Sequence, residues 1–142
     1  MWGYGFSQIN EQSLLSFTLG NVNGDPEATQ ATEDAFFING VIHKLSTVRF
    51  ERLDNVWIFK TESKVKELGQ CNLKFTFENE EIDNVNYLLI MKEQSQFFGY
   101  WSGTFVSETG VVHQIDKAKG VVEEMKSRGW QLITLKETNI FD

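Results

Sequence analysis

The side chains that could take part in chemistry are few, and they lie far apart along the chain. The acidic pair Glu33 and Asp34 follows a long polar segment, and two carboxylates can share acid and base roles when their environments separate their pKa values. Adjacent residues on a strand, however, point to opposite faces of a sheet. We therefore expect at least one of the two to be solvated or to accept hydrogen bonds. The sequence predicts no catalytic residue.

Metal and thiol chemistry have little support either. The two histidines, His43 and His113, have no cysteine or carboxylate beside them at the spacing of metal ligands, so we predict no metal and no cofactor. His43 is expected to be structural or to act as a polar anchor for a ligand. Cys71 is the only cysteine, which excludes an internal disulfide and agrees with a reducing compartment such as the cytoplasm.

The most distinctive stretch is an aromatic run, FFGYWSG, at residues 97–103. On a strand, one face would carry Phe97 and Trp101 together with two glycines. The opposite face would carry Phe98 and Tyr100. The glycines leave room beside the Trp101 ring, either for a ligand or for a ring from another strand, and the sequence favours the second interpretation, core packing.

Charge and hydropathy exclude several classes of partner. The net charge is −7 and the pI is near 4.8, without a cluster of Lys and Arg that could neutralise a phosphate backbone or dock on an anionic membrane. No apolar run approaches the ~20 residues that span a bilayer. The N-terminus has no basic stretch followed by an apolar one, as a secretory signal would. We expect a cytoplasmic protein that binds no nucleic acid and does not cross a membrane.

The pattern of apolar residues predicts an all-β domain over residues 1–142. Apolar and polar residues alternate at 15–19 and 73–78, and the 12 Phe, 4 Trp and 3 Tyr suit strands around a bulky core. Asn39-Gly40 is the strongest hairpin signal. Further turns are predicted at 10–11, 53–55, 79–81 and 108–110. Eight to ten short antiparallel strands at this spacing indicate a barrel or a sandwich.

Two regions depart from this pattern. Residues 20–32 form a long polar loop. Residues 116–128 are the only good helix candidate, because Ala118, Val121, Val122 and Met125 have helical spacing, with Asp116 as a possible cap. Residues 131–142 are expected to be an extra tail.

A series of short stretches is more specific in its order and spacing than any one of its members. These stretches are GN at 20–21, GD at 24–25, ATEDAFF at 31–37, GVIHKL at 40–45, VRF at 48–50, VWI at 56–58, LKFTF at 73–77, QFFGYWSGT at 96–104, ID at 115–116, Gly120 and Trp130. Through them the chain resembles the C-terminal half of domain-of-unknown-function family 2804. That family is similar to lipocalin-like proteins that include carotenoid hydratases and relatives of tocopherol cyclase. The resemblance implies a calycin-type antiparallel barrel that holds an apolar ligand.

The chain also departs from the family pattern. Asp34 stands where the family usually has asparagine, residues 63–70 look like an insertion, and the tail extends beyond the usual end. Because the resemblance covers only the C-terminal half, a second copy or another protein could replace the missing N-terminal half.

The predicted fold is an antiparallel, lipocalin-like β-barrel or a strongly curved sheet, with one helix near the C-terminus. The leading functional hypothesis is a non-catalytic, lipocalin-like module that binds a hydrophobic small molecule or lipid. The expected lining residues are Trp57, Phe75, Phe77, Phe97, Tyr100 and Trp101, with His43 and Asp34 as polar anchors. The alternatives are an assembly subunit that contacts a partner protein and an enzyme on an isoprenoid-like substrate. A dry apolar cavity would favour the binding module. An internal cavity with converging ionisable groups would favour the enzyme. A filled core with an exposed apolar patch would favour the assembly subunit.

Overall fold

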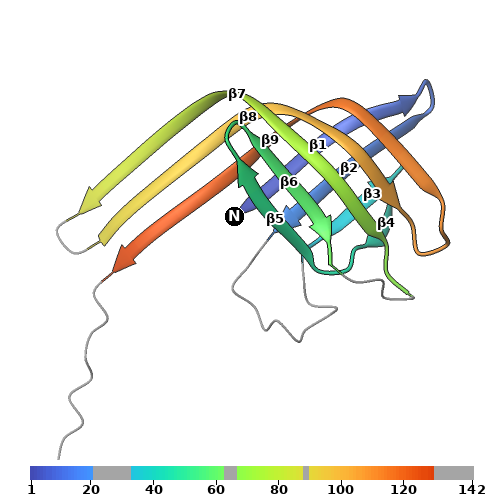
Figure 1. Ribbon diagram of the computed structural model, residues 1–142, viewed down its shortest axis with the longest axis horizontal. Helices are drawn as coiled ribbons and strands as arrows, with labels where there is room; N and C mark the ends of the chain where they lie inside the picture. The colour runs from blue at the N-terminus through green and yellow to red at the C-terminus, as the bar shows by residue number, and fades with distance from the viewer. Residues whose placement is uncertain (21–32, 63–66, 88–89, 130–142) are drawn as a thin grey trace, which may run out of the picture.

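The chain folds into a single antiparallel sheet that curls strongly around its own side chains (Figure 1). The computed structural model describes residues 1–20, 33–62, 67–87 and 90–129. Within these residues the strands are β1 (Trp2–Asn10), β2 (Ser13–Gly20), β3 (Ala35–Ile38), β4 (Val41–Lys44), β5 (Val48–Leu53), β6 (Val56–Thr61), β7 (Gln70–Tyr87), β8 (Ile90–Val106) and β9 (Val112–Gly129). Their order across the sheet is β4-β3-β2-β1-β9-β8-β7-β6-β5. The expected antiparallel all-β fold is confirmed.

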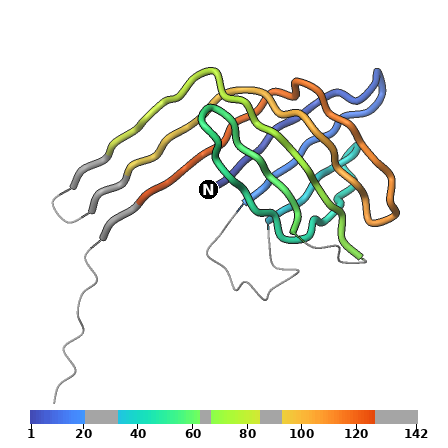
Figure 2. Tube along the Cα trace, viewed as in Figure 1, coloured from blue at the N-terminus to red at the C-terminus, as the bar shows by residue number. Residues whose placement is uncertain are grey.

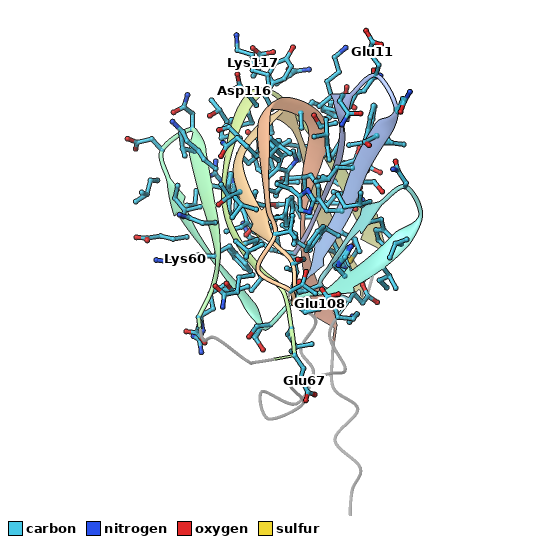
Figure 3. The ribbon with its side chains drawn as sticks, turned by 90° about the vertical axis from the view of Figure 1, so that its right-hand side faces the viewer. Glu11, Lys60, Glu67, Glu108, Asp116 and Lys117 are labelled. Atoms are coloured by element: carbon cyan, nitrogen blue, oxygen red, sulfur yellow. The ribbon has the colours of Figure 1, made fainter. Side chains whose placement is uncertain are left out.

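The inner face of the curled sheet carries one hydrophobic core. In the tube view the front strands β5 and β6 cross over the rear strands β1 and β2, and side chains fill the space between them (Figures 2 and 3). Alternate residues of every long strand point inward, as the period of two requires. The largest fully buried side chains are Trp101, Phe36, Phe59, Phe75, Phe97, Phe105, Leu15, Leu19, Leu45, Leu73, Ile115 and Val122.

A row of three glycines crosses the sheet, and two of them, Gly5 and Gly120, admit the largest core side chain. Gly5 pairs with Gly120, and Gly120 pairs with Gly99, on three neighbouring strands. A Cβ atom on Gly120 would lie 2.4 Å from the indole nitrogen of Trp101. That nitrogen donates a hydrogen bond to the carbonyl oxygen of Tyr4 at 3.1 Å. Only residues without a side chain leave the Trp101 ring this close to the backbone.

Hydrogen bonds stabilise the curl near the short connection between the two edge strands, β4 and β5, which follow one another in the sequence. Residues 45–47 join β4 to β5, although these strands lie at opposite edges of the sheet. The amide of Gly69 donates to the carbonyl of Lys44 at 2.7 Å, and the amide of Ser46 donates to the carbonyl of Gly69 at 3.0 Å. These bonds connect the β4 edge to the start of β7 and hold one end of the sheet closed.

The other end continues as a three-stranded ribbon. Strands β7, β8 and β9 bend in the middle and run on beyond the core (Figure 1). The register of β7 shifts between Phe77 and Asn79, which marks a bulge at the point where β6 has ended its pairing. From Asn79 onward, β7 pairs with β8 alone.

The predicted helix at 116–128 is wrong, because these residues lie in β9. Ala118 and Val122 are four residues apart, a separation that fits both a helix and two periods of a strand. Pairing decides in favour of the strand: Gly120 lies between Gly5 and Gly99, and Val122 points into the core. Helix propensity does not encode such long-range partners.

The predicted turns have mixed outcomes. Asn39 and Gly40 both have positive φ, 51° and 82°, so the hairpin between β3 and β4 is confirmed, and turns near 10–11, 54–55 and 108–109 are also present. The turn predicted at 79–81 is wrong, because these residues follow the bulge inside β7. Residues 21–32 of the predicted loop, part of the 63–70 segment and the tail at 131–142 lie outside the described residues.

Within the described part of the chain, no helix has the length and apolar character that a membrane crossing requires.

Candidate functional site: an aromatic groove on the outer face

Most of the predicted lining residues belong to the filled core. Trp57, Phe75, Phe97 and Trp101 are at most 2% exposed. The ring centroids of Phe75 and Trp101 are 4.7 Å apart, and those of Trp57 and Phe97 are 5.8 Å apart. Phe77 is partly buried against the same cluster. These rings fill one another's space, so the inner face offers packing where a ligand cavity was expected.

The two predicted polar anchors lie in separate places. Asp34 is buried, and its carboxylate accepts hydrogen bonds from the amide of Gly20 at 2.8 Å and the amide of Val48 at 3.3 Å. It thereby ties the end of β2 to the start of β5. This matches the expectation that one of the two acidic residues accepts hydrogen bonds.

His43 belongs to a different contact. Its ring stacks on Phe36, with centroids 4.7 Å apart, and its Nδ1 lies 2.9 Å from Oε2 of Glu108 in the β8–β9 turn. The hydrogen bond with His43 is the main reason that the pKa of Glu108 lies below its ordinary value. Glu108 lies near the end of the molecule opposite Asp116 and Lys117 (Figure 3).

Tyr100 is the one predicted lining residue on the outer face, and it marks a groove of about 600 Å³. The floor is the glycine row, Gly5, Gly120 and Gly99. The walls are two rows of outward-facing residues that the strand register sets on either side. One row is Ser16, Phe6, Lys119 and Tyr100, and the other contains Tyr4, Val121, Phe98 and Asn79.

One aromatic wall residue, Tyr4, is held in place by neighbouring polar groups. The hydroxyl of Tyr4 donates to Oε1 of Glu123 at 3.3 Å, and Nε2 of Gln96 donates to the same oxygen at 2.8 Å. Burial, followed by the negative charge of Glu123, raises the pKa of Tyr4. Tyr4 therefore stays neutral at physiological pH and presents its ring to the groove. Besides the tyrosines, the lining contains the ionisable side chains of Lys119 and Glu78.

Sequence reasoning missed most of this groove. The alternation of the aromatic run sets Phe98 and Tyr100 on one face of a strand, which is the correct signal. Their partners Tyr4 and Phe6 are more than 90 residues away in the sequence, and only the β1–β9 pairing brings the two pairs together. No local pattern predicts that pairing.

Reactive groups do not gather elsewhere in the described residues. Cys71 is 3% exposed, and burial, together with the charge of Asp34, raises the pKa of its thiol. A thiol in this state is a poor nucleophile. The described residues contain no group of three or more His, Cys, Asp or Glu side chains placed to hold a metal ion.

Comparison with protein families gives one match, to the model described as Domain of unknown function (DUF2804), over residues 1–130. The chain belongs to this family. The matched residues include the strands β1 to β9, the glycine row and both walls of the groove. No curated protein and no solved structure matches the chain.

Proposed function

We propose that the chain is a non-catalytic binding module, and that a flat hydrophobic small molecule occupies the groove between the two aromatic rows. The observation that carries the proposal is the groove itself, whose volume of about 600 Å³ lies within the usual range for small-molecule sites. Phe6 is 59% exposed and Tyr4 is 44% exposed, so large apolar surface faces water in the free protein. A ligand between the walls would remove that surface from water.

The shape of the groove favours a ring system over a flexible chain. The glycine floor exposes backbone, and aromatic side chains stand on both sides at the spacing of alternate strand residues. Stacking on such rings contributes about 0.5–1.5 kcal/mol per pair beyond the burial of area. The resemblance to lipocalin-like proteins supports a binding role, although here the proposed site is outside the curled sheet.

Titration with the neutral polycyclic dye Nile red tests this proposal by fluorescence. We expect Tyr100→Ala and Phe98→Ala each to weaken binding by about 3- to 10-fold, the equivalent of one lost stacking contact. Leu14→Ala is the matched control, because Leu14 is an exposed apolar residue on the outer face of β2 and does not line the groove. Equal binding by the two aromatic variants and the wild type would contradict the proposal. So would a loss of binding in Leu14→Ala of the same size.

A second candidate function, assembly with another copy of this chain, rests on a different observation. Strand β4 is an edge of the sheet, and its Val41 and Ile42 are 60% and 53% exposed. An open edge with exposed apolar residues is a template for strand pairing. Light scattering after gel filtration should then show a dimer that Ile42→Lys converts to a monomer. A monomeric wild-type chain at high micromolar concentration would rule this out.

A further inference from the structure

The inner face carries a buried hydrogen-bond donor that the fold leaves unused. Among the described residues, the indole nitrogen of Trp57 is the one buried side-chain nitrogen or oxygen without a hydrogen-bond partner. Trp57 is 2% exposed. A buried donor without a partner costs about 1–3 kcal/mol, so a native structure that retains one calls for an explanation.

Arg52 lies directly opposite Trp57 in the β5–β6 hairpin. Its guanidinium carbon lies 5.2 Å from the ring centre of Trp57, 5.6 Å from that of Phe77 and 5.0 Å from that of Phe97. The charged group therefore covers an aromatic surface near the bulge at Phe77, where the ribbon begins. Arg52 itself is exposed, so the long side chain can swing away into solvent.

This arginine has no acidic partner among the described residues of a strongly acidic protein. None of the ion pairs there includes Arg52, whereas Arg49 on the same strand pairs with Glu62. In the described part of the chain, its side chain donates one hydrogen bond, from Nε to the backbone oxygen of Asp54 at 3.4 Å, which is long. The terminal N–H groups of the guanidinium, whose geometry matches a carboxylate, are thus available for a ligand.

The inner face continues from this point along the ribbon as a mixed surface, with Glu80 opposite Phe97 and Glu124 opposite Ser95. Phe97 and Ser95 point to the inner face of β8, and Ile82, which pairs with Ser95, is 58% exposed. An apolar chain that begins at Arg52 could lie over Phe77 and reach Ile82. The inner face of the ribbon would then cover one side of that chain.

We propose that Arg52 and Trp57 form a binding site for the carboxylate of an apolar acid. The guanidinium moves from the aromatic rings to the carboxylate, the indole N–H of Trp57 donates to one of its oxygens, and the alkyl part of the ligand packs on Phe77 and Ile82. This site lies on the inner face of the sheet, so it is separate from the outer groove and goes beyond the function proposed for it.

Calorimetric titration with decanoate tests the site, with decanol as a neutral ligand of the same chain length. The wild type should bind decanoate at least 10-fold more tightly than decanol. Arg52→Met should remove that preference, and Arg52→Lys should keep part of it, because lysine retains the charge without the guanidinium geometry. Trp57→Phe should weaken decanoate binding by about 3- to 10-fold, the value of one hydrogen bond to a charged group.

A readout on the unmodified protein makes the test independent of any folding defect. In a ¹H–¹⁵N spectrum, one indole resonance, assigned by its absence in Trp57→Phe, should shift downfield with decanoate and stay in place with decanol. Tyr100→Ala should bind decanoate as the wild type does, which separates this site from the groove. Equal affinity for decanoate and decanol, or an unmoved Trp57 resonance at saturation, would overturn the proposal.

Discussion

Trp101 shows how one side chain can determine the residues allowed around it. Its ring contacts those of Phe17, Phe59 and Phe75 at centroid distances of 4.7–5.1 Å, and it also lies close against Gly5 and Gly120. The space beside the ring that the sequence left open for a ligand is filled by these aromatic neighbours. Of the two interpretations of the space beside Trp101, a ligand or a ring from another strand, the second therefore agrees with the structure.

Adding a single methyl group to the glycine row should therefore be costly. A Cβ on Gly120 would lie 2.2 Å from the carbonyl oxygen of Tyr4, so we expect Gly120→Ala to lower the free energy of unfolding by about 2–3 kcal/mol. Gly40→Ala is the control, because its Cβ would meet nothing within 4 Å and only its positive φ is unfavourable, at about 1 kcal/mol. Urea denaturation measures both. Equal losses would mean that the backbone at Tyr4 and the Trp101 ring both shift aside at little cost.

The contact between His43 and Glu108 gives a pH dependence of known sign. The lowered pKa of Glu108 means that its folded-state carboxylate is stabilised, so this contribution is present above its ordinary pKa near 4.5 and is lost as the pH falls through the lower folded value. Its side chain is 39% exposed, so solvent screening limits the contribution to less than about 1 kcal/mol.

Denaturation of Glu108→Gln at several pH values checks this. The variant should be less stable than the wild type at pH 6, and the difference should disappear toward pH 3. Glu11→Gln, at the tip of the β1–β2 turn, is the control and should show no such trend (Figure 3). A difference in stability that grows as the pH falls would contradict the expected sign.

At the scale of elements, the limits of the sequence are clearest in β7 and β9. Local alternation predicted the strand at 73–78, and Asn39-Gly40 predicted the hairpin between β3 and β4. Both signals lie within a few residues of the sequence. The acidic stretch at 79–81 resembles a turn in composition but continues β7 past a bulge, since β8 supplies a partner for each of these residues. Likewise, β9 depends on Gly5 and Gly99, which are distant in sequence.

The two halves of β7 should differ in local stability. Residues 72–76 pair with both β6 and β8, whereas residues 80–84 pair with β8 alone and have exposed side chains. We expect amide hydrogens of residues 80–84 to exchange at least 100-fold faster than those of residues 72–76, because opening the ribbon exposes little apolar surface. Exchange followed by NMR measures this directly. Equal protection along the strand would indicate that another chain covers the ribbon.

At the scale of the whole molecule, the curl separates two surfaces that bind in different ways. The outer groove is preformed and apolar, whereas the inner site proposed at Arg52 requires a charged side chain to move. The composition indicated a bulky aromatic core but could not indicate which aromatic residues face outward, because a shift of one residue in strand register exchanges the two faces. For this reason the predicted lining combined Tyr100 with residues that the structure places in the core.

The order of strands also bears on how the molecule folds. Among the described residues, seven of the eight strand pairings join strands that follow one another along the chain, and only β1 with β9 joins distant segments. Two local meanders, β1–β4 and β5–β9, can therefore form quickly by themselves, while their joining carries the entropy of closing a long loop. Gly5 and Gly120 face each other at that junction. The rate-limiting encounter then takes place along the glycine row, so substitutions there should slow folding itself more than they hasten unfolding.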